Sequence, residues 1–233
     1  MKNIKTIAFD ADDTLWINEP IYVNTQQKCK SIIQSFVDPE VLDEKLYQTE
    51  MKNLRLFGYG IKGFILSMVE TAIELSKGKI SGEEIRQIID LGKDMIEHPV
   101  QVLPNVRESL EQLQEGFELM IITKGDLFDQ ESKIARSGLA DYFCNVEIVS
   151  EKNEVTYKSV LSKYRININE FIMIGNSLKS DVLPIFNIGG KAIHIPFHTT
   201  WQHETVEAHH FEGIHYHELP DISLVPDFLK SNR

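Results

Sequence analysis

Residues 7–15 read Ile7-Ala8-Phe9-Asp10-Ala11-Asp12-Asp13-Thr14-Leu15, an apolar run that ends in three carboxylates within four residues. A buried strand cannot continue through these acids, because an unpaired buried charge is very costly. We therefore predict a strand that stops at Asp10 and presents its carboxylates at its C-terminal end. Ligands bind at that edge in open parallel α/β sheets.

The spacing of the acids suggests a division of chemical labour. Asp10 and Asp12 lie two residues apart, so one can act as a nucleophile while the other carries a proton. Carboxylates are also the ligands that a hard cation such as Mg²⁺ prefers. A solvated acidic turn is the alternative for this stretch alone, and the remainder of the chain must decide between the two.

Composition narrows the classes of protein and partner. The chain has 233 residues, of which 42% are hydrophobic and 25% charged, and its formal net charge is −11. No basic stripe is visible, so nucleic acid is not an expected partner. Cys29 and Cys144 have no CxxC or metal-ligand spacing, which argues against a disulfide framework. No apolar stretch reaches the roughly 20 residues of a membrane span. We expect a cytoplasmic protein without a membrane partner.

The pattern of apolar residues divides the chain. Residues 16–98 show helical spacing and no convincing strand, with a capping box at Ser81 and Glu84. From residue 99 strands and helices alternate, as in a parallel α/β domain. Strands are predicted over 5–9, 117–123, 144–149, 171–175 and 191–195, and helices over 105–115, 127–137, 155–164, 180–186 and 224–230. The helical segment therefore splits an α/β domain.

Polar residues follow three more of the predicted strands. Thr123 ends one strand and precedes Lys124 and a glycine, a turn whose hydroxyl and backbone N–H groups can hold phosphate oxygens. Lys152 follows the next strand, where an ammonium can neutralise a phosphate. Asn176 and Asp181 follow the strand after that, in the sequence Gly-Asn-Ser-Leu-Lys-Ser-Asp.

The order Asp10, Thr123, Lys152, Asp181, each after an apolar strand, resembles the four motifs of the haloacid dehalogenase-like superfamily. This resemblance implies a Rossmann-like core, a parallel sheet with helices on both faces, formed by residues 1–15 and 99–233. It implies that residues 16–98 are an inserted all-helical cap of the C1 type. Lys158 is an alternative to Lys152 for the third motif, but it lies inside a predicted helix.

The resemblance also implies an activity. It points to a Mg²⁺-dependent phosphatase that hydrolyses a small phosphorylated metabolite through an aspartyl-phosphate. Asp10 would be the nucleophile and Asp12 the general acid and base. The metal would be held by Asp10, by Asp181 and by the backbone carbonyl of Asp12. The superfamily usually has an acid where this chain has Asn176, so we rank Asn176 behind Asp181 as a ligand.

Thr123, Lys124 and Lys152 are the expected phosphate-binding residues. Lys62, in the turn Gly-Tyr-Gly-Ile-Lys-Gly, is a further candidate for contact with the substrate. Caps of this kind select the substrate, so phosphoglycolate, nucleoside monophosphates and sugar phosphates are all candidates.

Three other interpretations were weighed against this one. A catalytically weak superfamily member that binds a phosphometabolite or a protein partner is the main alternative, because of Asn176. A response-regulator receiver would lack the helical insert and the fourth motif. A zinc site is suggested by seven histidines from His194 onward, but they show no ligand spacing, so we predict a polar surface excursion there. These seven are His194, His198, His203, His209, His210, His215 and His217.

Overall fold

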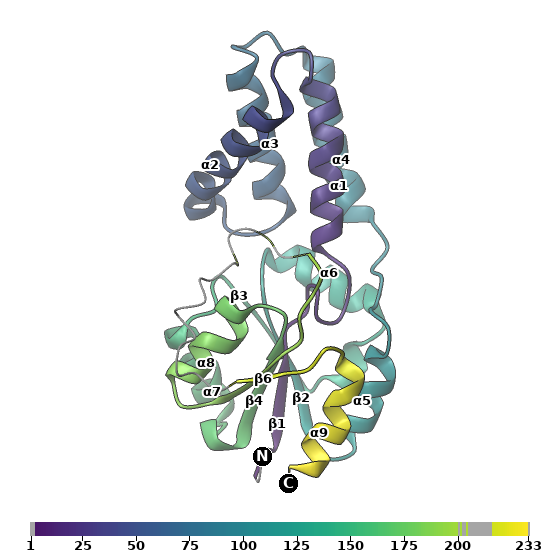
Figure 1. The fold of residues 1–233 in the computed structure, drawn as a ribbon, viewed down its shortest axis with the longest axis vertical. Coiled ribbons are helices and arrows are strands. Elements are labelled where there is room, and N and C mark those ends of the chain that lie inside the picture. The colour runs from purple at the N-terminus through teal and green to yellow at the C-terminus, as the bar shows by residue number, and fades with distance from the viewer. Residues whose placement is uncertain (1–2, 200, 202–203, 205–215, 233) are drawn as a thin grey trace. The chain divides into compact units, whose positions relative to one another are not determined.

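The computed structural model describes residues 3–199, 201, 204 and 216–232 and divides the chain into two compact units (Figure 1). The core unit comprises Met1–Glu19, Val100–Lys124 and Gln130–Arg233. The helical unit comprises Pro20–Pro99 and Gly125–Asp129. Relative to the boundaries suggested by the sequence, residues 16–19 lie in the core unit, while residues 99 and 125–129 lie in the helical unit.

Backbone contacts account for both differences. Trp16 forms β-bridges with Asp12 and with Val102, which tie it to the core unit. Within the helical unit, Gly60 packs so closely against Asp126 that an added Cβ would lie 3.0 Å from the Asp126 Cβ. Gly60 has a φ of 112°, a conformation that favours glycine.

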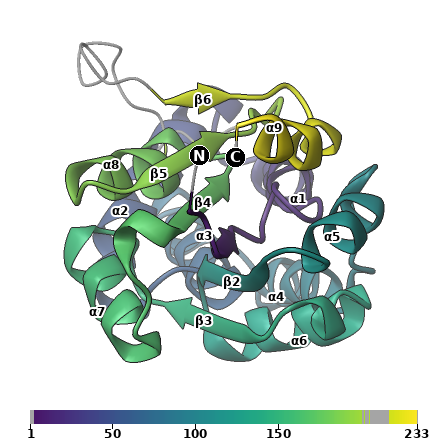
Figure 2. The same cartoon turned by 90° about the horizontal axis from the view of Figure 1, so that it is seen from below.

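The core unit is built on a six-stranded parallel sheet with the order β3-β2-β1-β4-β5-β6. Figure 2 shows the strands in this order. Their bounds are β1 Thr6–Phe9, β2 Glu118–Lys124, β3 Asn145–Val149, β4 Phe171–Gly175, β5 Lys191–His194 and β6 His217–Glu218. The five strands expected from the sequence are confirmed to within one residue at each end. The sixth was missed because it has only two residues.

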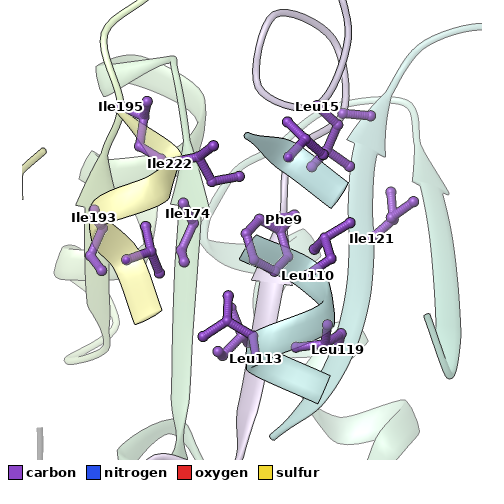
Figure 3. Packing of buried hydrophobic residues seen from close by; sticks show 14 of the residues in the cluster. Phe9, Leu15, Leu110, Leu113, Leu119, Ile121, Ile174, Ile193, Ile195 and Ile222 are labelled. Atoms are coloured by element: carbon purple, nitrogen blue, oxygen red, sulfur yellow. The ribbon is translucent and has the colours of Figure 1, made fainter. Parts of the chain in front are cut away.

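Alternate residues of the strands face two different hydrophobic clusters. Ile7 and Phe9 of β1 pack with α5 (Val106–Gln114) and α9 (Val225–Ser231), as Figure 3 shows for part of this cluster. Ala8 faces the other way, toward α7 (Glu154–Tyr164) and α8 (Leu183–Asn187). A strand buried on both faces reads as a continuous apolar run, which is the pattern of β1. The expected α/β core with helices on both faces is confirmed.

Two helical segments of the chain bear on the site. α6 (Leu127–Ser137) is a helix at the bounds that the sequence predicts. The helix expected over 180–186 is instead a π-helical turn, Leu178–Val182, followed by α8. Ser177 begins this turn, and its Oγ accepts a hydrogen bond from the Ser180 N–H at 3.0 Å. π-Helical turns are rare and occur often at functional sites.

The helical unit has its own hydrophobic core. Its helices are α1 (Glu19–Ile33), α2 (Pro39–Phe57), α3 (Ile61–Leu75) and α4 (Gly82–Glu97). Buried residues from all four, among them Cys29, Leu46, Met68 and Ile88, form one cluster. The capping box of Ser81 and Glu84 is present at the start of α4, as predicted. Within the described part of the chain, none of the helices has the length and apolar character needed to cross a membrane.

Candidate active site

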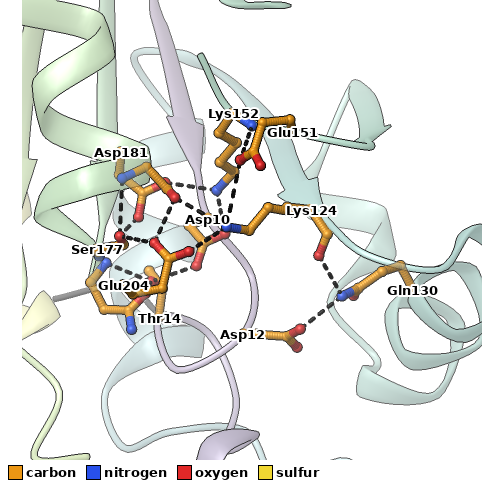
Figure 4. Close-up of polar contacts among 12 residues, drawn as sticks. Asp10, Asp12, Thr14, Lys124, Gln130, Glu151, Lys152, Ser177, Asp181 and Glu204 are labelled. Atoms are coloured by element: carbon orange, nitrogen blue, oxygen red, sulfur yellow. Dashed lines mark hydrogen bonds and ion pairs between the residues drawn. The ribbon is translucent and has the colours of Figure 1, made fainter. Parts of the chain in front are cut away.

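Three of the predicted residues, Asp10, Lys152 and Asp181, form one buried cluster at the C-terminal end of β1. The Lys152 ammonium donates to Asp10 Oδ1 and, at 2.7 Å, to Asp181 Oδ1 (Figure 4). The three side chains come from the ends of three segments: Asp10 follows β1, Lys152 lies between β3 and α7, and Asp181 belongs to the turn after β4. All three are almost fully buried. Lys158, the alternative lysine, is exposed on α7.

Asp181 is seated by the backbone that precedes it. Its Oδ2 accepts the Ser177 N–H at 3.0 Å. A Cβ added at Gly175 would lie 2.1 Å from the same oxygen, so only glycine permits this approach. The sequence Gly-Asn-Ser thus ends β4 with a residue that has no side chain and holds Asp181 against Lys152.

Burial and charge act in opposite directions on this cluster. Burial raises the pKa of Asp10 to about 7, even though Lys152 acts to lower it. For Lys152, burial acts to lower the pKa, but Asp10 and Asp181 together hold it above the usual range for a lysine. The lysine is therefore charged, and its ammonium offsets negative charge on the two carboxyl groups that it contacts.

The Asn176 amide lies close to two oxygen atoms that could hold a divalent metal ion. The Asn176 amide Oδ1 lies 3.2 Å from Asp10 Oδ2 and 3.3 Å from the carbonyl oxygen of Asp12. Oxygen pairs of this kind share no hydrogen, so their approach calls either for a reversed amide, with its NH₂ donating, or for a cation between them. Adjacent ligands of an octahedral Mg²⁺ lie about 2.9 Å apart. In the described residues, no three His, Cys, Asp or Glu side chains form a metal-binding group.

This arrangement gives Asn176 and Asp181 different surroundings. Asn176 faces the Asp10 carboxylate and the Asp12 carbonyl, and its N–H donates to Thr14 Oγ1 at 3.1 Å. Both oxygens of Asp181 accept hydrogen bonds, one from Lys152 and one from the Ser177 N–H. A metal at the three oxygens would therefore meet the amide directly. The ranking of Asp181 ahead of Asn176 as a ligand stays a prediction.

Asp12 points to a different set of partners from those of Asp10. Figure 4 shows its carboxylate turned toward Gln130. Asp12 Oδ1 accepts from Trp16 Nε1 at 2.7 Å, and Oδ2 accepts from Gln130 Nε2 at 2.7 Å. The Lys133 ammonium lies 2.7 Å from Oδ1 and 2.9 Å from Oδ2. Two neighbouring carboxylates of one loop are thus held by separate lysines, Asp10 by Lys152 and Asp12 by Lys133.

The third acid of the loop, Asp13, caps a helix. Its carboxylate accepts the backbone N–H groups of Asn18, at 2.8 Å, and of Glu19, at 2.9 Å, where α1 begins. Asp13 has a φ of 61°, a left-handed conformation that Asp tolerates better than most residues. Burial raises its pKa to about 7. Asp13 therefore has a structural task that leaves Asp10 and Asp12 for chemistry.

Thr123, the last residue but one of β2, has an unsatisfied hydroxyl. It is 1% exposed, and its Oγ1 has no hydrogen-bond partner among the described residues. A buried polar atom without a partner costs about 1–3 kcal/mol. A bound ligand would remove this cost by supplying the missing partner. A phosphate oxygen could accept a hydrogen bond from the Thr123 hydroxyl.

Lys124 is paired with a residue that the sequence did not suggest. Its ammonium donates to Glu204 Oε1 at 2.5 Å and to Ser180 Oγ at 3.2 Å. Glu204 Oε2 accepts from Ser177 Oγ and Ser180 Oγ at 2.5 and 2.6 Å. Burial acts to raise the pKa of Glu204, but Lys124 and the hydroxyls lower it to about 2. Glu204 thus adds a fixed anion to the strand ends of the core unit.

The remaining predicted residues lie elsewhere or outside the description. Lys62 belongs to the helical unit, where its ammonium pairs with Asp126 at 2.9 Å and lies 5.5 Å from the centre of the Phe128 ring. His194 is buried, with one ring nitrogen 3.0 Å from the Asn176 carbonyl oxygen and the other 2.9 Å from Glu218. The described histidines of the C-terminal region are His194, His198 and His217; His203, His209, His210 and His215 lie outside the described residues.

Four partners of the site were missed by sequence reasoning: Trp16, Gln130, Lys133 and Glu204. Gln130 and Lys133 lie three residues apart on α6, so they share one face of that helix. This spacing, one turn after the Thr-Lys-Gly turn, is the signal that could have found them. Glu204 follows the last predicted strand in a polar region, and no local pattern distinguishes it.

Comparisons with known proteins bear on the family and the fold of the chain. A family model described as haloacid dehalogenase-like hydrolase matches residues 4–189. The crystal structure of a haloacid dehalogenase-like family hydrolase from Xanthomonas campestris is 39% identical, with a TM-score of 0.87 over 98% of this chain and 91% of that chain. A 2-haloacid dehalogenase from Pseudomonas syringae is 19% identical, with a TM-score of 0.64 over 99% of this chain and 100% of that chain, and it shares the fold.

A curated relative adds an activity to the comparison. A glyceraldehyde 3-phosphate phosphatase from Pyrococcus abyssi is 32% identical over 97 residues, which is 39% of this chain and 41% of the relative. The match thus spans about two fifths of the relative's length. The curated relative is therefore a phosphatase, whereas the 2-haloacid dehalogenase shows only that the fold is shared.

Proposed function

Because the chain belongs to the haloacid dehalogenase-like hydrolase family, we propose that it is a phosphatase that hydrolyses a small phosphorylated metabolite through an aspartyl-phosphate on Asp10. The observation that carries this proposal is the pair Asp10 and Asp12. The two carboxylates lie on one loop, yet separate lysines hold them. Carboxylates in distinct environments can take distinct roles, one as nucleophile and one as proton carrier. A halide leaves without a proton, whereas the alkoxide of a phosphate ester needs one.

Each step uses a residue of the core unit. Asp10 attacks phosphorus, so that a new O–P bond forms while the bond from phosphorus to the leaving oxygen breaks. Asp12 gives a proton to that oxygen. In the second step Asp12 takes a proton from the attacking water, and the O–P bond to Asp10 breaks. The Lys152 ammonium and the Thr123 hydroxyl stabilise charge on the oxygens of the transferred group.

A divalent metal fits this scheme. Mg²⁺ would be held by the Asp10 carboxylate, the Asp12 carbonyl and an oxygen of Asn176 or Asp181. When bound, it would offset the repulsion between the carboxylate nucleophile and the phosphate. Support comes from the approach of Asp10 Oδ2 and the Asp12 carbonyl oxygen to the same end of the Asn176 amide.

The relative from Pyrococcus abyssi suggests where to start the search for a substrate. Glyceraldehyde 3-phosphate, phosphoglycolate, nucleoside monophosphates and sugar phosphates form the first panel. The wild-type protein with Mg²⁺ should release phosphate from at least one of these and from p-nitrophenyl phosphate. Phosphate binding without turnover of any ester would favour the alternative, a binding protein of the same family.

Two substitutions test the assigned roles. Asp10→Asn removes the nucleophile, so no phosphoenzyme should form and turnover should be lost. Asp12→Asn leaves the nucleophile in place, and general acid–base help is worth about 10² to 10⁴ in rate. The loss should be small for p-nitrophenyl phosphate, whose leaving group hardly needs a proton, and larger for an alkyl phosphate. Single-turnover kinetics with intact-mass detection of the adduct measure both. Equal losses for the two esters would contradict the role of Asp12.

A further inference from the structure

The half-buried Asp12 carboxylate is surrounded by hydrogen-bond donors. Its two oxygens accept four contacts, one each from Trp16 and Gln130 and two from Lys133. These contacts come from only three donor groups, because the Lys133 ammonium spans both oxygens, so a carboxylate with about four lone-pair sites can still take up a proton. Rotation of the carboxylate in either direction would break several of these contacts at once. Its orientation is therefore fixed by the protein.

The donors themselves are held in place. Gln130 is 2% exposed, and its Nε2 also donates to the Lys124 carbonyl oxygen at 3.2 Å. The Lys133 side chain is 11% exposed, and its ammonium also donates to Asn18 Oδ1 at 3.2 Å. Trp16 is fully buried. Helix α6, Asn18 and the acidic loop are thus tied together at one point, the Asp12 carboxylate.

Burying these donors carries a cost that the fold alone does not explain. Lysine is rarely buried to this extent, because its ammonium loses hydration. Gln130 Oε1 is also buried, and it has no hydrogen-bond partner in the described part of the chain. Unfavourable burial that converges on one side chain next to a candidate nucleophile is typical of a functional site.

We propose that Lys133 and Gln130 are positioning residues for Asp12, and that they hold its carboxylate where it serves the leaving-group oxygen. This inference rests on the proposed phosphatase function. Lys133 also offsets the negative charge that Asp12 acquires once it has given its proton to the leaving oxygen. Neither residue contacts the substrate in this scheme, so both act through Asp12.

The test is a double-mutant cycle measured with phenyl phosphate and an alkyl phosphate. Lys133→Met should lower kcat at least about tenfold, within the 10² to 10⁴ that Asp12 supplies, and change KM little. In the Asp12→Asn background the same substitution should change kcat by less than about twofold, because the residue it positions has lost its function. Gln130→Leu should show the same dependence on Asp12 with a smaller loss. Lys133→Arg, which keeps the charge, should recover most of the rate.

The control is Arg136→Met, which removes a cation from an exposed position on the same helix and should leave kcat near the wild-type value. Near-ultraviolet circular dichroism checks the fold of each variant, and Gln130→Leu carries the cycle if Lys133→Met does not fold. Equal factors of loss in the wild-type and Asp12→Asn backgrounds would overturn the proposal, and so would wild-type kcat in Lys133→Met. In both cases the phosphatase proposal still holds if the wild type is active and Asp10→Asn is not. A wild type without turnover overturns both.

Discussion

At the scale of the residue, substitution of Thr123 should affect anion binding and protein stability differently. Its buried Oγ1 has no partner in the described structure, so Thr123→Val removes an unsatisfied polar atom. We expect the free energy of unfolding to stay the same or to rise by about 1 kcal/mol. Inhibition by inorganic phosphate or vanadate should weaken about tenfold, because a hydrogen bond to a charged oxygen is lost. Denaturant titration and inhibition kinetics measure the two effects.

Thr71 provides the matched control. It lies on α3 in the helical unit, and its Oγ1 is also buried without a hydrogen-bond partner among the described residues. Thr71→Val should change stability in the same direction and leave the inhibition constant alone. If phosphate or vanadate inhibits Thr123→Val as strongly as it inhibits the wild type, the hydroxyl is not part of the anion-binding site.

Residues of the site differ in how far the sequence reveals them. Asp10, Thr123, Lys152 and Asp181 each follow an apolar strand, so their place at one edge of the sheet could be predicted from chain order. Lys133, the single lysine of α6, is less evident, because a lysine on a helix usually faces solvent and only the packing of α6 brings this one to Asp12. The partner of Lys124 likewise depends on the path of the chain after β5.

At the scale of the element, Glu50 on α2 predicts how the helical unit responds to pH. Burial raises the pKa of Glu50 to about 7, from an ordinary value near 4.5. Between these values the folded state binds a proton that the unfolded state lacks, so stability falls as pH rises toward 7. At pH 8 Glu50 is ionised in the folded state, and burial of this charge lowers the free energy of unfolding by its full amount. Glu50→Gln should then be more stable than the wild type by about 1 kcal/mol or more.

Below pH 4.5 the advantage of Glu50→Gln should vanish, because the wild-type carboxyl is then neutral in both states. Denaturant unfolding at pH 4.5 and pH 8 measures the difference. Glu44→Gln, at an exposed position of the same helix, is the control and should show no such dependence. If the free energy of unfolding differs between the wild type and Glu50→Gln by the same amount at both pH values, burial does not raise the pKa of Glu50.

Elements were predictable where one physical signal dominated. Buried strands of a parallel sheet are continuous apolar runs, and β1, β2 and β4 match the expected ranges closely. The capping box fixed the start of α4. The π-helical turn was not predictable, because Ser180 and Asp181 are ordinary residues for the first turn of an α-helix. In the structure Asp181 lies in this turn, where it contacts Lys152 and packs against Gly175.

At the scale of the whole molecule, the two units have separate hydrophobic cores. The sequence indicated two parts because helical spacing interrupts a run of strands and helices. It did not assign 125–129 to the helical unit, since that depends on Gly60 and Lys62 contacting Asp126. Both tryptophans of the chain, Trp16 and Trp201, belong to the core unit. Tryptophan fluorescence therefore reports the unfolding of the core unit.

That reporter tests the proposed metal without any measurement of activity. A ligand that binds only the folded state stabilises it, by about 2.7 kcal/mol at one hundred times its Kd. Mg²⁺ should therefore raise the midpoint of the fluorescence-detected transition, and a chelator should reverse the rise. Asp10→Asn should abolish the effect, and Asn176→Ala should reduce it if the amide oxygen is a ligand.

The acidic character of the chain makes a control for screening necessary. With a formal net charge of −11, the protein is stabilised by any cation that screens repulsion among its acids. Sodium chloride at matched ionic strength measures that general effect. Asp90→Asn removes a carboxylate of the helical unit and should keep the full Mg²⁺ response, because it touches no proposed ligand. If Asp10→Asn responds to Mg²⁺ as strongly as the wild type, the stabilisation is screening and the metal does not bind at the end of β1. If the response depends on Asp10 and Asn176 but not on Asp181, the neutral amide replaces the acid as a metal ligand, and Asp181 serves to hold Lys152.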